Sequence, residues 1–200
     1  TDTRVFLRAN GDNGSELWMT DGTVAGTQRL PEVRPGSQSA EIAYDIVALG
    51  DRVIFSADDG IHGRELFVAD ENGPLLLADI DPGSDGSGHP NGSSPQNLVR
   101  SGDWVYFTAS SPTAGQELFR TDGTPANTML VADIRAGSGS SFPMLMKAFR
   151  DGLVFRADDG DSAHGREAWY VPNATGVAQL MADVNPGGGD GCDRGPLVAA

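Results

Sequence analysis

The chain has 200 residues, and its 28 acidic against 14 basic residues give a formal net charge of −14 at pH 7. Such a charge repels phosphate backbones, so we expect no nucleic-acid partner. No stretch approaches the roughly 18 apolar residues of a membrane span, and the single cysteine, Cys192, excludes an internal disulfide framework. The sequence opens Thr-Asp-Thr-Arg without a signal peptide, as a mature product or a fragment would.

Strand-like segments alternate with turns along the whole chain. The first covers residues 4–9 and has no strand-like segment before it. The best-defined group covers residues 42–49, 52–57, 64–69 and 75–80, with a tight turn at Gly50-Asp51. No run shows the 3.6-residue period and caps of a helix, so almost no helix is expected.

One motif occurs four times, and its glutamates, Glu16, Glu65, Glu117 and Glu167, lie 49, 52 and 50 residues apart. A fixed period in this range indicates a repeat architecture, and four short antiparallel strands per repeat are what one propeller blade needs. We therefore predict an all-β, four-bladed β-propeller of four-stranded antiparallel blades, as a single domain over residues 1–200.

The two ends of the chain complement each other. Residues 195–200 resemble the first strand that residues 4–33 lack. We expect this C-terminal strand to pair in the N-terminal blade and close the ring, which removes exposed sheet edges. The predicted blades are residues 195–200 with 4–33, then 41–80, 94–134 and 142–184.

Residues that recur in the repeats are expected to serve the scaffold. The repeated glutamate should bond backbone or turn donors within its own blade. The turn Asp21-Gly22-Thr23 should use Asp to accept a local N–H and Gly to supply a positive φ. Recurrent alanines should give room where strands crowd: Ala9, Ala57, Ala109 and Ala157. Large aromatic side chains should pack between neighbouring blades: Trp18, Phe67, Phe119 and Trp169.

The loops after the second and fourth strands of each repeat should share one face, which gathers many aspartates and all three histidines. Function on repeat scaffolds tends to lie in such variable loops. The second and fourth repeats share Ala-Asp-Asp-Gly followed by His-Gly-Arg-Glu. Candidate binding residues on this face are His62, Arg64, His89, His164 and Arg166.

Calcium is an alternative occupant of these loops, because hard cations take several oxygen ligands at flexible geometry. Its candidate ligands are Asp58, Asp59, Asp158, Asp159 and Asp161. A metal held by His62 and His164 across the ring is conceivable, although we favour their interpretation as turn residues of a repeat consensus. No other cofactor is indicated.

The residues Glu16-Leu17-Trp18-Met19-Thr20-Asp21-Gly22-Thr23 resemble the ELWxxDGT repeat of large secreted bacterial proteins. Residues 117–124 follow this motif closely, and Asp79-Ile80-Asp81-Pro82-Gly83-Ser84 resembles the segment that closes that repeat. The resemblance covers essentially the whole chain and departs from the motif at residues 70–72, at Ala168 and at residues 172–173. It implies a propeller-like fold in a secreted or cell-surface bacterial setting, and it transfers no catalytic residue.

Three functions remain open. We favour a non-enzymatic extracellular binding or adhesion module that presents the Asp-rich loop face to a protein, a glycan or calcium. The second is a structural subunit of a surface assembly or filament, self-assembling through exposed residues such as Trp104, Phe142 or Cys192. The third is a hydrolase or lyase with a site in a central funnel, for which the histidine pair and its neighbouring carboxylates are the only candidates.

Overall fold

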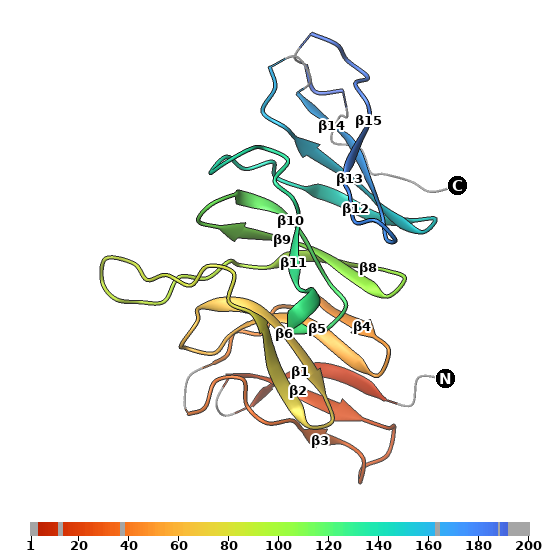
Figure 1. Cartoon of the computed structure of the whole chain (residues 1–200). Helices are drawn as coiled ribbons and strands as arrows, with labels where there is room; N and C mark the ends of the chain where they lie inside the picture. The colour runs from red at the N-terminus through yellow and green to blue at the C-terminus, as the bar shows by residue number, and fades with distance from the viewer. Residues whose placement is uncertain (1–3, 12–13, 37–38, 163–164, 188, 192–200) are drawn as a thin grey trace. The chain divides into compact units, whose positions relative to one another are not determined.

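A computed structural model describes residues 4–11, 14–36, 39–162, 165–187 and 189–191. The described residues form an all-β, β-propeller-like fold of antiparallel sheets, with one short 3₁₀ turn at Pro125–Asn127 (Figure 1). The prediction of almost no helix is confirmed. No helix in these ranges is long and apolar enough to cross a membrane.

Four sheets follow one another along the chain, and each runs through its strands in sequence order. The first comprises β1 (Val5–Gly11), β2 (Gly14–Thr20) and β3 (Gln28–Arg29). The second comprises β4 (Ile46–Leu49), β5 (Arg52–Asp58), β6 (Arg64–Asp70) and β7 (Gly73–Ala78). The third comprises β8 (Gln96–Ser101), β9 (Trp104–Ser111), β10 (Gly115–Thr121) and β11 (Met129–Ala132). The fourth comprises β12 (Met144–Phe149), β13 (Gly152–Asp158), β14 (Arg166–Pro172) and β15 (Gln179–Ala182).

The first sheet has three strands among the described residues, where four were predicted. Within the part of the chain that the structure describes, its edge strand β1 pairs only with β2. The segment predicted to supply the fourth strand, residues 195–200, lies outside the described residues. In the second repeat the first strand starts at Ile46 rather than at residue 42, because the chain bulges before β4.

Contacts group the chain into two compact units, which we call unit 1 and unit 2. Unit 1 holds residues 1–95 and 123–125, and unit 2 holds residues 96–122 and 126–200. In unit 1, Leu17 of the first sheet and Phe67 of the second share one apolar core. In unit 2, Tyr106 and Leu118 pack with Phe155, and Trp169 packs against that core. The expected inter-blade packing is thus confirmed for Phe67 and Trp169 inside their own units.

The repeated glutamates are buried acceptors for the loop that follows their own fourth strand. Glu65 is fully buried and accepts the N–H of Ser93 at 2.8 Å and its hydroxyl at 2.5 Å. Glu117 accepts the same pair of donors from Ser141, at 2.9 and 2.5 Å. Burial raises the pKa of both carboxyl groups, against the serine hydrogen bonds that lower it.

The repeated glutamate also accepts hydrogen bonds from backbone N–H groups at the start of the loop that follows the fourth strand. Glu117 accepts the N–H of Ile134 at 3.3 Å, and Glu167 accepts those of Val184 at 3.3 Å and Gly191 at 2.8 Å. Glu65, Glu117 and Glu167 therefore each hold both ends of the segment that leads out of their repeat, whereas Glu16 accepts a hydrogen bond from Arg29 at 2.7 Å. The prediction that the glutamate bonds backbone donors within its own blade is confirmed for Ile134 and Val184. It is wrong for Ser93, which lies beyond the blade predicted to end at residue 80.

The recurrent alanines stand directly opposite the glutamates on the neighbouring strand. Ala57 pairs with Glu65 and Ala109 with Glu117, and both alanines are fully buried. A larger side chain at this register would compete with the carboxylate for space. The sequence-based expectation that alanine gives room is met at Ala57 and Ala109, whereas Ala9 is only half-buried.

The turns that precede the last strand of a sheet form as predicted. Residues in these turns also accept hydrogen bonds or ion pairs from arginine side chains. Asp21 accepts the N–H of Thr23 at 2.9 Å, and Gly22 has φ 91°. In unit 1, Arg4 forms an ion pair with Glu71 at 2.5 Å, and Arg52 donates to the carbonyl of Gly123 at 2.9 Å. These arginines stand at or just before the start of the second strand of their repeats.

The fourth repeat replaces the Asp-Gly-Thr turn with Pro172-Asn173-Ala174, and Asn173 ties together several segments of unit 2. Its N–H donates to Asp151 O at 2.7 Å, and its amide donates to Ser101 O at 3.1 Å. The Tyr106 hydroxyl donates to its side-chain oxygen at 2.9 Å, and Arg120 donates to its carbonyl at 3.1 Å. Asn173, which departs from the repeat motif, thus connects several segments of unit 2 by hydrogen bonds.

Candidate functional site on the loop face of unit 1

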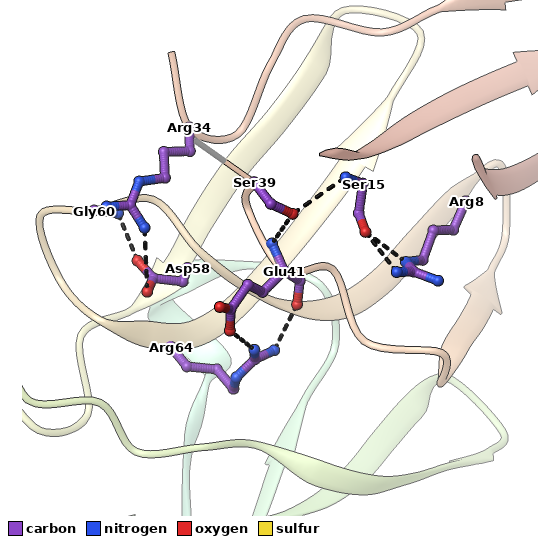
Figure 2. A network of polar contacts seen from close by, with 8 residues as sticks. All are labelled: Arg8, Ser15, Arg34, Ser39, Glu41, Asp58, Gly60 and Arg64. Carbon is purple, nitrogen blue, oxygen red and sulfur yellow. Dashed lines mark hydrogen bonds and ion pairs between the residues drawn. The ribbon is translucent and has the colours of Figure 1, made fainter. Parts of the chain in front are cut away.

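An arginine from the first repeat covers the Asp-Asp-Gly loop of the second. Arg34 lies in the segment after β3, and its guanidinium approaches the Asp58 carboxylate at 3.5 Å (Figure 2). Asp58 also accepts the N–H of Gly60 at 2.6 Å. A Cβ on Gly60, which has φ 80°, would lie 2.8 Å from Arg34 Nε, so glycine leaves room for the guanidinium. The carboxylate of Asp58, a predicted calcium ligand, therefore already interacts with the Arg34 guanidinium and with the Gly60 N–H of its own turn.

Asp59 and His62 form a hydrogen-bonded pair in the same loop. Asp59 accepts the N–H groups of Ile61 and His62, both at 2.8 Å, and its second oxygen lies 2.7 Å from His62 Nδ1. Burial raises the pKa of Asp59, but these hydrogen bonds outweigh it and leave the pKa below its ordinary value. The hydrogen bond and charge of Asp59 raise the pKa of His62. The pair closes the loop and favours a protonated imidazole.

A polar network crosses from the first repeat to the second (Figure 2). Arg8 donates to the hydroxyl of Ser15 at 2.5 and 3.0 Å, and Ser15 N–H donates to the hydroxyl of Ser39 at 3.1 Å. The Ser39 hydroxyl in turn accepts the N–H of Glu41 at 3.1 Å. Arg64 ends the network by donating to both the carbonyl and the carboxylate of Glu41, each at 2.7 Å. Arg64, predicted as a binding residue, is therefore held in a fixed position.

Tyr44 projects from this network with 87% of its surface exposed. The Arg8 guanidinium carbon lies 4.5 Å from the centre of the Tyr44 ring, which is a cation–π contact. We call Arg8, Glu41, Tyr44 and Arg64 the Tyr44 cluster. Ile61, three residues before Arg64 in the chain, is 72% exposed and adds apolar surface to its loop.

The bulge that carries Tyr44 is longer than its counterpart in the third repeat. Residues 43–47 lie opposite residues 54–56, so that five residues face three. In the third repeat, residues 96–99 lie opposite residues 106–108, so that four face three. Bulges often redirect a side chain next to a functional site. The additional residue in the second repeat is what turns an aromatic side chain outward here.

The backbone at Glu41 is strained in a way that recurs. Glu41 has φ 47°, and the residues that follow the loop in the next two repeats, Ser94 and Phe142, have φ 52° and 48°. A non-glycine residue in this region costs about 1–2 kcal/mol. Because the same conformation recurs in three repeats, it belongs to the repeat scaffold and does not single out the Tyr44 cluster.

The predicted residues of the fourth repeat only partly mirror this arrangement. Asp158 accepts Gly160 N–H at 2.8 Å and lies 3.7 Å from Arg135, as Asp58 lies near Arg34. Asp159 accepts the N–H of Asp161 at 2.9 Å. Arg166 begins β14, and its N–H donates to Asp190 at 3.1 Å. His164 lies outside the described residues, so the imagined pairing of His62 with His164 is not described.

His89 is exposed in the insertion of unit 1, and its Nδ1 lies 3.2 Å from Asp85. Hydrogen bonds from the N–H groups of His89 and Ser87, and then from the His89 ring, lower the pKa of Asp85. The pair organises its own loop. Among the residues that the structure describes, no three or more His, Cys, Asp or Glu side chains are grouped to hold a metal ion. Four of the predicted calcium ligands accept hydrogen bonds from their own turns, namely Asp58, Asp59, Asp158 and Asp159.

Sequence reasoning missed Tyr44, Arg8 and the pairing of Arg34 with Asp58. The signals for the last were present, because Arg34 and Arg135 occupy the same repeat position, each ahead of an Asp-Asp-Gly loop. Tyr44 could have been found from the additional residue before β4. Which loop each arginine would reach depended on how neighbouring sheets pack.

Neither a protein-family model nor a curated protein matches the sequence. Among solved structures, the chain is similar to one from a structural and mechanistic analysis of two prolyl endopeptidases, with TM-score 0.52 and 15% identity. That alignment covers 90% of this chain and 25% of the other. It is also similar to TolB from Acinetobacter baumannii, with TM-score 0.49, 11% identity, and 90% and 41% coverage. The chain thus spans well under two thirds of either structure, and the first supports the β-propeller-like fold alone.

Proposed function

We propose that this chain is a non-enzymatic binding module that recognises a protein partner through the Tyr44 cluster. The observation that carries the proposal is the exposed Tyr44 ring, stacked on Arg8 in a network that ends at Arg64. Tyrosine and arginine are enriched at the energetic centres of protein interfaces. Fixing these side chains before binding reduces the entropy lost on association.

The Asp-rich loops support this surface and do not need to contact the partner. Asp58 and Asp59 are engaged by Arg34, His62 and turn N–H groups, which leaves Tyr44 and Ile61 as the prominent side chains. A glycan or calcium bound by the aspartates, a self-assembling subunit, and a hydrolase or lyase are the competing functions. Calcium binding and self-assembly each predict a different outcome of the tests below.

The proposal includes a closed four-bladed ring in a secreted or cell-surface protein. Support for closure is that β1 lies at the edge of its sheet among the described residues, together with the strand-like sequence of residues 195–200. Cysteines introduced at Val5 and Val198, in a Cys192→Ser background, should form an intramolecular disulfide under mild oxidation. Only intermolecular products, or none, would refute ring closure while leaving the Tyr44 cluster untouched.

The binding test uses the purified chain as bait for secreted and envelope proteins of the cells that produce it. We expect one protein to be captured in stoichiometric amount and then to bind with a Kd that Tyr44→Ala weakens about tenfold or more. Arg8→Ala should weaken it similarly. Val24→Ala is the matched control, because Val24 is 96% exposed in the turn between β2 and β3 of unit 1.

Three results would overturn the protein-partner proposal. The first is a partner that binds Tyr44→Ala as tightly as the original chain. The second is a melting temperature that falls with chelator and returns with calcium, which would assign the loop face to a metal. The third is a concentration-dependent mass that Tyr44→Ala does not alter, together with no captured protein, which would favour assembly.

A further inference from the structure

Unit 2 carries an open hollow of about 500 Å³ that the sequence did not indicate. The end of β12, the turn after it, β14 and β15 line this hollow, with Phe149, Arg150, Asp151, Tyr170, Gln179 and Met181. Pockets of this size, with a few placed polar groups on an apolar lining, are the usual form of small-molecule sites. The hollow therefore lies near the turn that joins β12 to β13, at the opposite ends of the strands from the Asp-rich loops.

The fourth repeat rearranges its hairpin turn at this place. The second and third repeats have glycine at the left-handed position, Gly50 with φ 65° and Gly102 with φ 61°. The fourth repeat has Arg150 there with φ 52°, and moves glycine two residues on to Gly152. A left-handed arginine costs about 1–2 kcal/mol relative to glycine, and strain of this kind concentrates at functional sites.

The displaced glycine fixes the orientation of Tyr170. A Cβ on Gly152 would lie 2.7 Å from two atoms of the Tyr170 ring, so the ring rests on the backbone of Gly152. An aromatic ring over a strand glycine is a known way to cover it. The Tyr170 hydroxyl is hydrogen-bonded to Asp151 at 2.9 Å, which holds the second end of the side chain. Tyr170 thus presents a fixed ring to the hollow.

The polar groups around this ring suit a neutral, hydroxyl-rich ligand. Arg150 offers only donors, Asp151 only acceptors, and Gln179 both. The adjacent opposite charges of Arg150 and Asp151 do not favour an ion of either sign. Neighbouring hydroxyl groups of one ligand can instead accept hydrogen bonds from the guanidinium and donate to the carboxylate. Burial, and then the hydrogen bond and charge of Asp151, raise the pKa of Tyr170, so the phenol stays protonated.

From the Tyr170 ring, the strained Arg150 and the mixed polar rim, we infer that the hollow binds a pyranose residue of a neutral saccharide. The C–H face of the sugar lies on an aromatic ring, whose π face is negative, and its hydroxyl groups bond Arg150, Asp151 and Gln179. Leu180 and Met181, which also line the hollow, supply apolar contact. This site is separate from the Tyr44 cluster, so neither proposal depends on the other.

Titrations of the isotope-labelled full chain with cellobiose and with maltose, followed by NMR, test the inference. We expect amide shifts at residues 149–152 and 179–181 with at least one of these disaccharides. Tyr170→Ala should weaken binding about tenfold. Arg150→Gly should also weaken it, while leaving the melting temperature unchanged or higher, because glycine suits φ 52°.

Tyr44→Ala is the control, since it removes an exposed tyrosine from unit 1 and should leave the affinity for saccharide unchanged. A lower melting temperature for Arg150→Gly with unchanged affinity would show that Arg150 serves stability, and would refute its role here. No shifts with either disaccharide, shifts confined to unit 1, or shifts at residues 179–181 with trialanine alone would overturn the saccharide site.

Discussion

Replacing Glu117 with alanine should destabilise the chain by about 3 to 4 kcal/mol. The carboxylate is fully buried and accepts four hydrogen bonds, from Ile134 N–H, Arg135 N–H and both the N–H and the hydroxyl of Ser141. The hydroxyl bond is the shortest, at 2.5 Å, and a charged hydrogen bond of this kind is worth about 1.5–3 kcal/mol. The two longer bonds add about 1 kcal/mol together.

One offset limits this magnitude. The N–H of Ser141 also donates to the carbonyl of Gln116 at 3.2 Å and keeps that partner in the variant. Ser141→Ala, which removes only the hydroxyl, should cost about 2 kcal/mol. The first repeat supplies the matched control, because Glu16 accepts its hydrogen bond from Arg29, a half-exposed side chain. Glu16→Ala should cost at most about 1 kcal/mol.

Denaturation in urea measures these differences as shifts of the midpoint at constant slope. For a chain of this length, 3 to 4 kcal/mol corresponds to a loss of about 6 to 16 °C in melting temperature. A cost below about 1 kcal/mol for Glu117→Ala, or equal costs for Glu117→Ala and Glu16→Ala, would show that the carboxylate clamp does not hold the loop.

Three further predictions follow from single residues. Burial raises the folded-state pKa of Glu65 above its ordinary 4.5, so its contribution to stability is complete below pH 4.5 and is lost as the pH rises through the folded value. Urea unfolding across this range should show the decline, and Glu65→Gln should flatten it; an unchanged slope would contradict the burial argument. Gly63→Ala should prevent folding of unit 1, because the new Cβ would lie 1.7 Å from Asn91 O. At Gly50 a Cβ meets open space, so Gly50→Ala should cost about 1–2 kcal/mol of stability. Similar losses of folded structure for both variants in circular dichroism would refute the steric reason. Asn173→Ala should cost about 2 to 4 kcal/mol, measured by thermal unfolding, because it strips partners from Tyr106 and Ser101; a loss of less than about 1 kcal/mol would exclude its bridging role.

The sequence by itself determined the strands and the scaffold residues. β5 and β6, at Arg52–Asp58 and Arg64–Asp70, lie within one residue of the predicted segments 52–57 and 64–69. The Asp21 turn formed as its residues require. These features depend on interactions between neighbours in the chain, namely β-branched and aromatic runs and local side-chain hydrogen bonds, so the local sequence carries the information. Because the motif occurs four times, the same local prediction applied to each repeat.

Only the tertiary structure decided which distant groups meet. Glu65 and Ser93 are 28 residues apart, and their hydrogen bond depends on where the loop returns to the sheet. An aspartate such as Asp59 can hold a turn, a histidine or a cation with the same carboxylate, and its packed neighbours select among these. Tyr44 and the hollow beside Tyr170 likewise arise from a bulge and a displaced glycine, whose consequences appear only when strands are paired in register.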